Sequence, residues 1–217
     1  MKGIFSLDGP VMRVMTIFTN LIILNLLTIL LSIPVITGGA ALTALDYCVL
    51  KMVRDEDAYV VKTYFKSFKE NFAMGMILWI PMVIVGFLVG FDLYLMRTAP
   101  NETIRKFRVV FVVLLFLIIL VLEWVFPLLS HFEYKKTGNY IRNAVLMALA
   151  NLPRTVLMFA ITIVPLIAMY FYFYKILPVI FIMGLSLPAF LKAMIYNTPF
   201  KKLETRYQDK NKDTVLE

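Results

Sequence analysis

The feature that most constrains this sequence is a series of apolar runs, each about as long as a helix that crosses a lipid bilayer. The run over 107–130 is the clearest, because it is an almost unbroken succession of Val, Leu, Ile and Phe. About 20 helical residues cross a hydrocarbon core of roughly 30 Å. Hydrophobic residues make up 61% of the chain and charged residues 17%, a composition too apolar for a water-soluble core to hide. We therefore expect lipid to be the solvent of this chain.

The apolar runs predict six membrane spans within one domain, 1–217. Their bounds are about 13–33, 35–53, 73–96, 107–130, 154–174 and 179–195, and a polar cytoplasmic tail, 197–217, follows. The first run is longer than the apolar region of a signal peptide, about 7–15 residues, so we expect it to be retained. The predicted fold class is all-α, a polytopic transmembrane helix bundle. The second run is polar enough to form a re-entrant element instead of a full span.

Small side chains mark the start of the second span and the middle of the third. Gly38 and Gly39 open span two, and Gly86 and Gly90 lie four residues apart in span three. Small residues let two helix backbones approach closely in a membrane. We expect both stretches to be close-packing faces.

An amphipathic segment, 58–71, follows the second span. Val61, Phe65, Phe68 and Phe72 recur at spacings of four, three and four, with Lys62, Lys66 and Lys69 on another side. This pattern is typical of a helix lying in the membrane interface. We expect Lys62, Phe65, Lys66, Phe68 and Lys69 to contact anionic lipid or a partner subunit. A shorter lead-in helix, about 140–151, is predicted before span five.

Two acids, Asp46 and Glu123, fall inside predicted spans, where a carboxylate costs about 2.5–3.5 kcal/mol. Both are predicted in the inner half of the membrane, within reach of Arg13, Arg54 and Arg154. The first interpretation is structural, because a buried ion needs a partner and such pairs would join spans one, two, four and five. The alternatives are a polar cavity for substrate or protons, or side chains that only extend toward the interface.

Two other polar side chains inside the spans have structural explanations. Asn20 and Asn25 lie in span one and are predicted to hydrogen-bond to neighbouring helices. Lys192 lies in span six and is expected to extend its ammonium group toward the interface.

The distribution of basic residues predicts the orientation. Most of the 22 Lys and Arg residues fall in four segments: 2–13, 51–69, 135–154 and 192–212. Basic residues near span ends mark the cytoplasmic side. Both termini are therefore predicted in the cytoplasm, which requires an even number of crossings of the cell membrane.

Several functions lack the residues they need. The sequence has no HExxH, GxSxG, Walker A or dinucleotide-binding motif. Its one histidine, His131, and one cysteine, Cys48, cannot form the common metal or disulfide sites. The net charge of +8 lies at span ends rather than along a soluble face, so nucleic-acid binding is not expected. We expect no catalytic residues, no metal site, no cofactor and no enzymatic activity.

Three stretches resemble one family. They are SIPVITGGAALTALDYCVLKMVRDEDAYVVKTYFKSFKENF, NAVLMALANLPRT and LPVIFIMGLSLPAFLKAMIYNTPFKK, and they are similar to the start, middle and end of the YesL-like family of Gram-positive integral membrane proteins. The family is a domain of unknown function associated with carbohydrate-utilisation operons. The resemblance implies a non-enzymatic accessory subunit beside the permease subunits of a carbohydrate ABC importer. A small transporter in its own right and a membrane scaffold or regulator are the alternatives.

Overall fold

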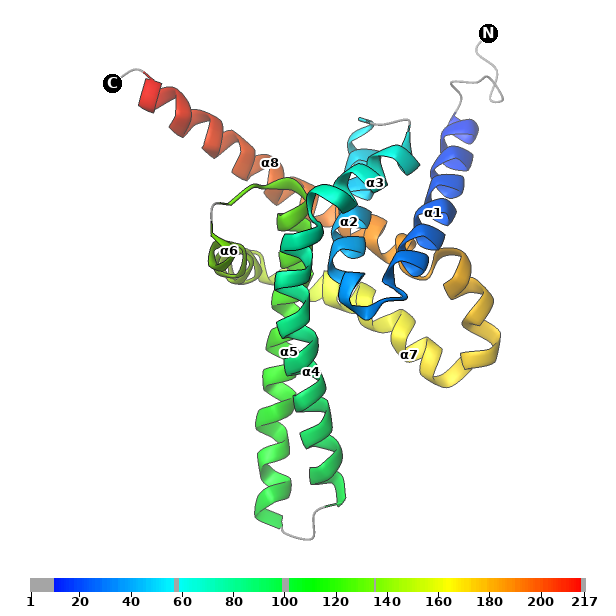
Figure 1. Ribbon diagram of the computed structural model, residues 1–217, viewed down its shortest axis with the longest axis vertical. Helices are drawn as coiled ribbons and strands as arrows, with labels where there is room; N and C mark the ends of the chain where they lie inside the picture. Colours follow the sequence, from blue (N-terminus) through cyan, green and yellow to red (C-terminus); the bar gives the residue numbers. More distant parts are fainter. Residues whose placement is uncertain (1–9, 57–58, 99–101, 135, 216–217) are drawn as a thin grey trace.

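The computed structural model describes residues 10–56, 59–98, 102–134 and 136–215, and every regular element in these ranges is a helix (Figure 1). The elements are α1 (Pro10–Ser32), a short 3-10 turn (Val35–Thr37), α2 (Gly38–Arg54), α3 (Val60–Glu70), α4 (Phe72–Thr98), α5 (Glu102–His131), α6 (Thr137–Ala150), α7 (Leu152–Met183) and α8 (Ser186–Val215). The predicted all-α fold class is confirmed.

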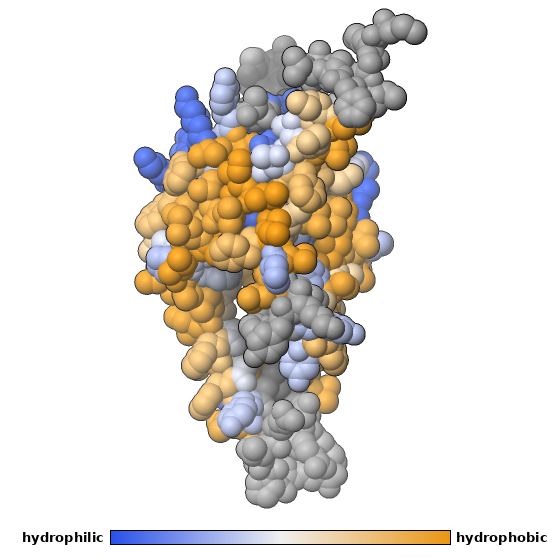
Figure 2. All heavy atoms as spheres, turned by 90° about the vertical axis from the view of Figure 1, so that its right-hand side faces the viewer, coloured by the Kyte–Doolittle hydropathy of each residue, from blue (hydrophilic) through white to orange (hydrophobic). Residues whose placement is uncertain are grey.

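Five helices in the described residues are long and apolar enough to cross a membrane, and a bent pair raises this number to as many as six. The pair is Leu177–Met183 with Ser186–Thr205, whose axes differ by 52°. The start of α1 and the end of α8 lie at the same end of the molecule (Figure 1). Apolar side chains cover most of the middle of the face in Figure 2, with the most hydrophilic ones mainly toward its upper part. The chain is a polytopic membrane bundle.

Helix α2 is the central element. Within its candidate span, 67% of the residues are buried, compared with 12–28% in the four other single-helix candidates. Gly39 packs against α4 so closely that a Cβ there would lie 2.4 Å from the carbonyl oxygen of Gly75. The predicted small face of α2 is therefore confirmed. The expectation for Gly86 and Gly90 is wrong, because a Cβ at either position meets no atom within 4 Å.

Helix α3 is amphipathic, but the side that faces the core is not the side that carries the regularly spaced phenylalanines. Val60, Tyr64 and Ser67 are buried, while Phe65 is 39% exposed. The Tyr64 hydroxyl donates to the carbonyl of Ala41 at 3.1 Å, and burial raises the pKa of this phenol well above its usual range. Phe65 and Phe72 are thus left on an uncovered apolar stripe. The second lead-in helix, α6, has 14 residues and is longer than α3, which has 11.

The last two helices have two irregular points, one inside α7 and one between α7 and α8, and neither lies at a proline. Inside α7 the backbone leaves helical geometry at Tyr172, with φ −126° and ψ 35°. The next break follows Gly184, where a Cβ would lie 2.6 Å from the Cα of Ile180. Only glycine fits that close return of the chain. Because the break leaves peptide groups without helical partners, other groups must bind them.

Asn25 of α1 binds peptide groups on both sides of the break. Its Nδ2 donates to the carbonyls of Ile180 and Phe181 at 3.1 and 2.7 Å. Its Oδ1 accepts from the N–H groups of Leu185 and Ser186 at 2.8 and 3.2 Å. The prediction that Asn25 hydrogen-bonds between helices is confirmed.

Candidate functional site

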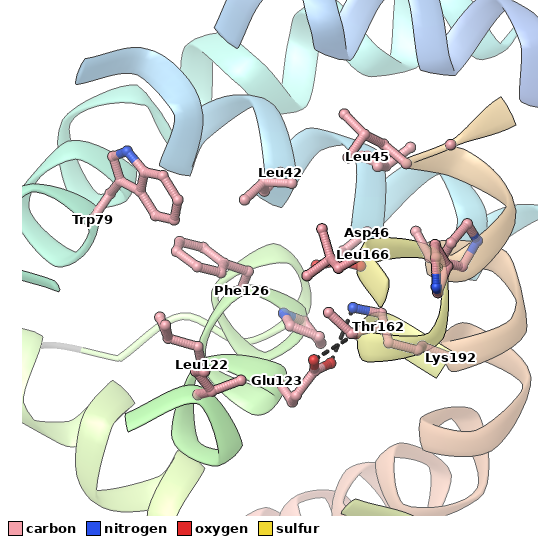
Figure 3. Close-up of a pocket in the computed structure, with 17 residues that line it drawn as sticks. Leu42, Leu45, Asp46, Trp79, Leu122, Glu123, Phe126, Thr162, Leu166 and Lys192 are labelled. Carbon is pink, nitrogen blue, oxygen red and sulfur yellow. Dashed lines mark hydrogen bonds and ion pairs between the residues drawn. The ribbon is translucent and has the colours of Figure 1, made fainter. Parts of the chain in front are cut away.

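The strongest concentration of charge inside the bundle lies where α5, α7 and α8 meet. Glu123 of α5 is 6% exposed. Its carboxylate binds the ammonium group of Lys192 of α8 at 3.0 Å and accepts a hydrogen bond from Thr162 Oγ1 of α7 at 2.6 Å (Figure 3). One buried carboxylate therefore joins three helices. Both of its oxygens have partners, which a buried charge requires.

Asp46 of α2 faces the same region and is 7% exposed. Its backbone carbonyl accepts a hydrogen bond from the Tyr196 hydroxyl at 3.3 Å. In the described part of the chain its carboxylate makes no hydrogen bond or ion pair, since Lys192 is paired with Glu123. Asp46 is thus a buried acid without a direct partner, beside an acid that has two.

A cavity of about 260 Å³ separates Asp46 and Glu123 from an aromatic wall. Trp79 of α4 and Phe126 of α5 form this wall, and their rings meet edge to face with centroids 5.7 Å apart (Figure 3). The remaining lining side chains are mostly apolar; they include Leu42, Leu45, Leu122, Leu166, Leu185 and Ala189. The cavity therefore has one charged side and one apolar side.

Local sequence explains why these side chains converge. The glycines of α2 let Trp79 pack across it, with the Trp79 indole N–H donating to the carbonyl of Val35 at 2.7 Å. The break at Gly184 and Leu185 ends α7 at the cavity wall and restarts the chain as α8, which carries Lys192. The close approach of α2 to α4 and the break between α7 and α8 together form the cavity.

The arginines predicted to pair with these acids bind other groups. Arg13 pairs with Asp55 at 2.6 Å on the surface, and Arg154 donates to Asn151 Oδ1 at 3.1 Å. The predicted pairing is wrong because the arginines lie at helix ends. Arg54, for example, is eight residues beyond Asp46 on α2, which is about 12 Å along a helix. The partner of Glu123 is Lys192, so the expectation that the Lys192 ammonium group extends toward the interface is wrong.

Arg54 belongs to a second polar cluster, one that the sequence does not predict. It donates to Glu204 Oε1 at 2.9 Å and to Asn197 Oδ1 at 2.8 Å, both on α8. His131, the last residue of α5, contacts the same oxygen of Glu204. The cluster ties α2 and α5 to α8. Arg54 and His131 are each 73 or more positions away in sequence from the α8 residues that they bind. No local spacing therefore predicts these contacts.

The surface predicted on α3 is present in the described chain. Lys62, Lys66 and Lys69 are exposed, and Lys66 lies 4.0 Å from Glu70. Phe68 packs partly against the core, whereas Phe65 stays outside it. A row of ammonium groups therefore runs beside an uncovered apolar stripe.

A purely apolar groove of about 490 Å³ lies between α4, α5 and α6. Its lining residues are Pro81, Met82, Val85, Leu114, Leu117, Ile118, Val121, Ile141 and Val145. The α4 and α5 residues belong to candidate membrane spans, so the groove opens at membrane depth. Its contents must be apolar.

The fold and these sites define a class of protein, an α-helical multi-pass membrane protein with a charged cavity in its interior. Among the residues that the structure describes, no three His, Cys, Asp or Glu side chains are placed to hold a metal ion. The family described as Protein of unknown function, DUF624, matches residues 21–93. That segment contains α2, α3 and most of α1 and α4. This match supports the YesL-like resemblance.

A relative also supports this resemblance. The uncharacterized protein YteU of Bacillus subtilis (strain 168) is 30% identical over 147 residues. The similar region is 67% of this chain and 64% of YteU, so the chain spans just under two thirds of the relative's length. No solved structure matches.

Proposed function

We propose that this chain is a non-enzymatic accessory subunit of the cell membrane that packs beside the permease subunits of a carbohydrate ABC importer. The choice of importer comes from the YesL-like resemblance. The observation that supports docking is the groove between α4, α5 and α6, because its lining is apolar and it opens at candidate-span depth. Helices associate in lipid through close packing rather than through hydrophobic burial, so a preformed groove favours a partner's transmembrane helix. The exposed lysines of α3 then lie on the cytoplasmic side, near anionic lipid.

Reciprocal co-purification tests this proposal. Tagged permease subunits of a sugar importer from the same cell should retain the chain in mild detergent, and the tagged chain should retain them. Leu117→Trp should reduce the retained fraction several-fold, because Leu117 lines the groove and is 54% exposed. Ile167→Trp is the matched control, since Ile167 is 51% exposed on α7, outside the groove. Equal retention by the two variants, or no permease with either tag, contradicts the proposal.

A small transporter is the second candidate, and the broken α7–α8 pair beside the cavity favours it. Transporters bind substrates near helix breaks at the middle of the membrane. If the chain transports, Asp46→Asn and Glu123→Gln should abolish uptake of a panel of labelled solutes into proteoliposomes at unchanged protein abundance. Loss of abundance alone would favour a structural role for both acids.

A further inference from the structure

We propose that the cavity between α2, α4, α5, α7 and α8 is a binding site for a small organic cation, an ammonium group attached to a compact apolar body. The inference goes beyond the accessory function and does not depend on it. The first observation is Asp46, whose buried carboxylate borders the cavity while lacking a hydrogen bond or ion pair within the described chain. A buried charge of this kind requires a compensating donor or cation.

The neighbouring ion pair shows which kind of cation the site accepts. The cavity already holds one alkylammonium group, that of Lys192, on the Glu123 carboxylate. When Asp46 is ionised, the two carboxylates and one ammonium leave the site one positive charge short of neutrality. A second ammonium group bound to Asp46 would neutralise the site. It would form an ion pair of the same kind as the neighbouring one between Lys192 and Glu123.

The wall opposite Asp46 suits the rest of such a ligand. Trp79 and Phe126 present aromatic surface to the cavity (Figure 3), and aromatic rings attract cations and pack against apolar groups. The volume of about 260 Å³ is just below the roughly 300–1,000 Å³ of pockets for drug-sized molecules. The ligand is therefore small, with one ring or a short alkyl chain.

An inorganic cation fits less well. A bare metal ion needs several oxygen ligands, but Glu123 is occupied by Lys192 and Thr162. The carbonyl oxygens beside the helix break, those of Ile180 and Phe181, are bound by Asn25. Asp46 remains as a single carboxylate, which can hold an ammonium group but cannot surround a metal ion.

Binding of phenethylammonium and n-butylammonium to the full-length protein in detergent tests the proposal, with thermal melting and calorimetry as readouts. A ligand that binds the folded state raises the melting temperature with its concentration. Phenethylammonium should stabilise the protein saturably, and its neutral analogue 2-phenylethanol should not. Asp46→Asn should weaken binding at least tenfold, whereas Asp92→Asn, on α4 and outside the cavity lining, should bind as the parent does.

A second pair of variants keeps the test decisive if Asp46→Asn does not fold. Leu166 lines the cavity and is 56% exposed, while its neighbour Ile167 is 51% exposed and does not line it. Leu166→Trp should therefore block entry and weaken binding at least tenfold, and Ile167→Trp should leave it unchanged. The proposal is overturned if neither ammonium compound binds saturably, if Asp46→Asn binds normally, or if the two tryptophan variants bind alike.

Discussion

At the scale of single residues, the ion pair between Glu123 and Lys192 makes the most specific prediction. Lys192→Met should strongly destabilise the fold, because Glu123 would keep its buried charge without a cation. Breaking a buried pair in this way costs about 3–5 kcal/mol. Thermal melting in detergent should show a large drop for Lys192→Met and little change for Lys201→Met, whose lysine is exposed on α8.

The double variant, Glu123→Gln with Lys192→Met, distinguishes the effect of an unpaired buried charge from the loss of Lys192 packing. Removing both charges leaves no buried ion, so the double variant should melt above Lys192→Met alone. A double variant that is as unstable as the single one would show that Lys192 supports the fold by packing instead of by charge.

Asn25 is the second residue with a sharply defined role. Asn25→Leu removes four hydrogen bonds at the α7–α8 break and leaves backbone groups such as the Phe181 carbonyl and the Leu185 N–H without their Asn25 partner. Each unsatisfied buried group costs about 1–3 kcal/mol. We expect a loss of folded protein on fluorescence-detected size exclusion, with Asn20→Leu as the control because Asn20 is only half-buried. Normal yield of Asn25→Leu would contradict the assigned role.

At the scale of elements, the contact of α2 with α4 depends on the absence of side-chain atoms. Gly75→Leu should separate these helices, since even a Cβ there would lie 2.8 Å from the backbone nitrogen of Ala40. Gly86→Leu, in the same helix, adds the same atoms where a Cβ meets nothing within 4 Å. Membrane abundance should fall several-fold for Gly75→Leu and stay near normal for Gly86→Leu. Equal abundance would show that close packing is not what holds α4 against α2.

The elements also show what the sequence can and cannot predict. Apolar runs locate the helices, because a helix of sufficient length and hydropathy is a local property. The glycines of α2 and α4 look alike in sequence, yet Gly39 and Gly75 meet another backbone whereas Gly86 and Gly90 meet no atom within 4 Å. Which glycine is covered depends on the neighbouring helix, so spacing alone cannot decide it.

The same limit applies to the cavity. The sequence identifies Asp46 and Glu123 as buried acids, because any charge inside an apolar run is costly. It does not identify Lys192 as the partner of Glu123, since these residues are 69 positions apart and meet only after the chain turns back at Gly184. Lys192 did carry a signal of its own, as the one lysine inside the expected sixth span, 179–195.

At the scale of the whole molecule, the chain is a helical membrane bundle held together by its centre. Helix α2 supplies the buried axis, the α4–α5 hairpin extends beyond the rest of the body, and the start of α1 and the end of α8 lie at the same end of the molecule (Figure 1). The basic residues near its helix ends predict the orientation of this bundle. The proposed contact of the α3 lysines with anionic lipid depends on that orientation, whereas cation binding in the cavity does not.

Cysteine accessibility in intact cells tests the predicted orientation in the membrane most directly. Cys48, the one native cysteine, is buried and 2% exposed, so it gives little background. With a membrane-impermeant maleimide, cysteines introduced as Lys69→Cys and Thr205→Cys should react only after the membrane is permeabilised. Asn101→Cys, between α4 and α5, should react in intact cells. Labelling of Lys69→Cys or Thr205→Cys in intact cells, or release of the protein into the soluble fraction, would contradict the account.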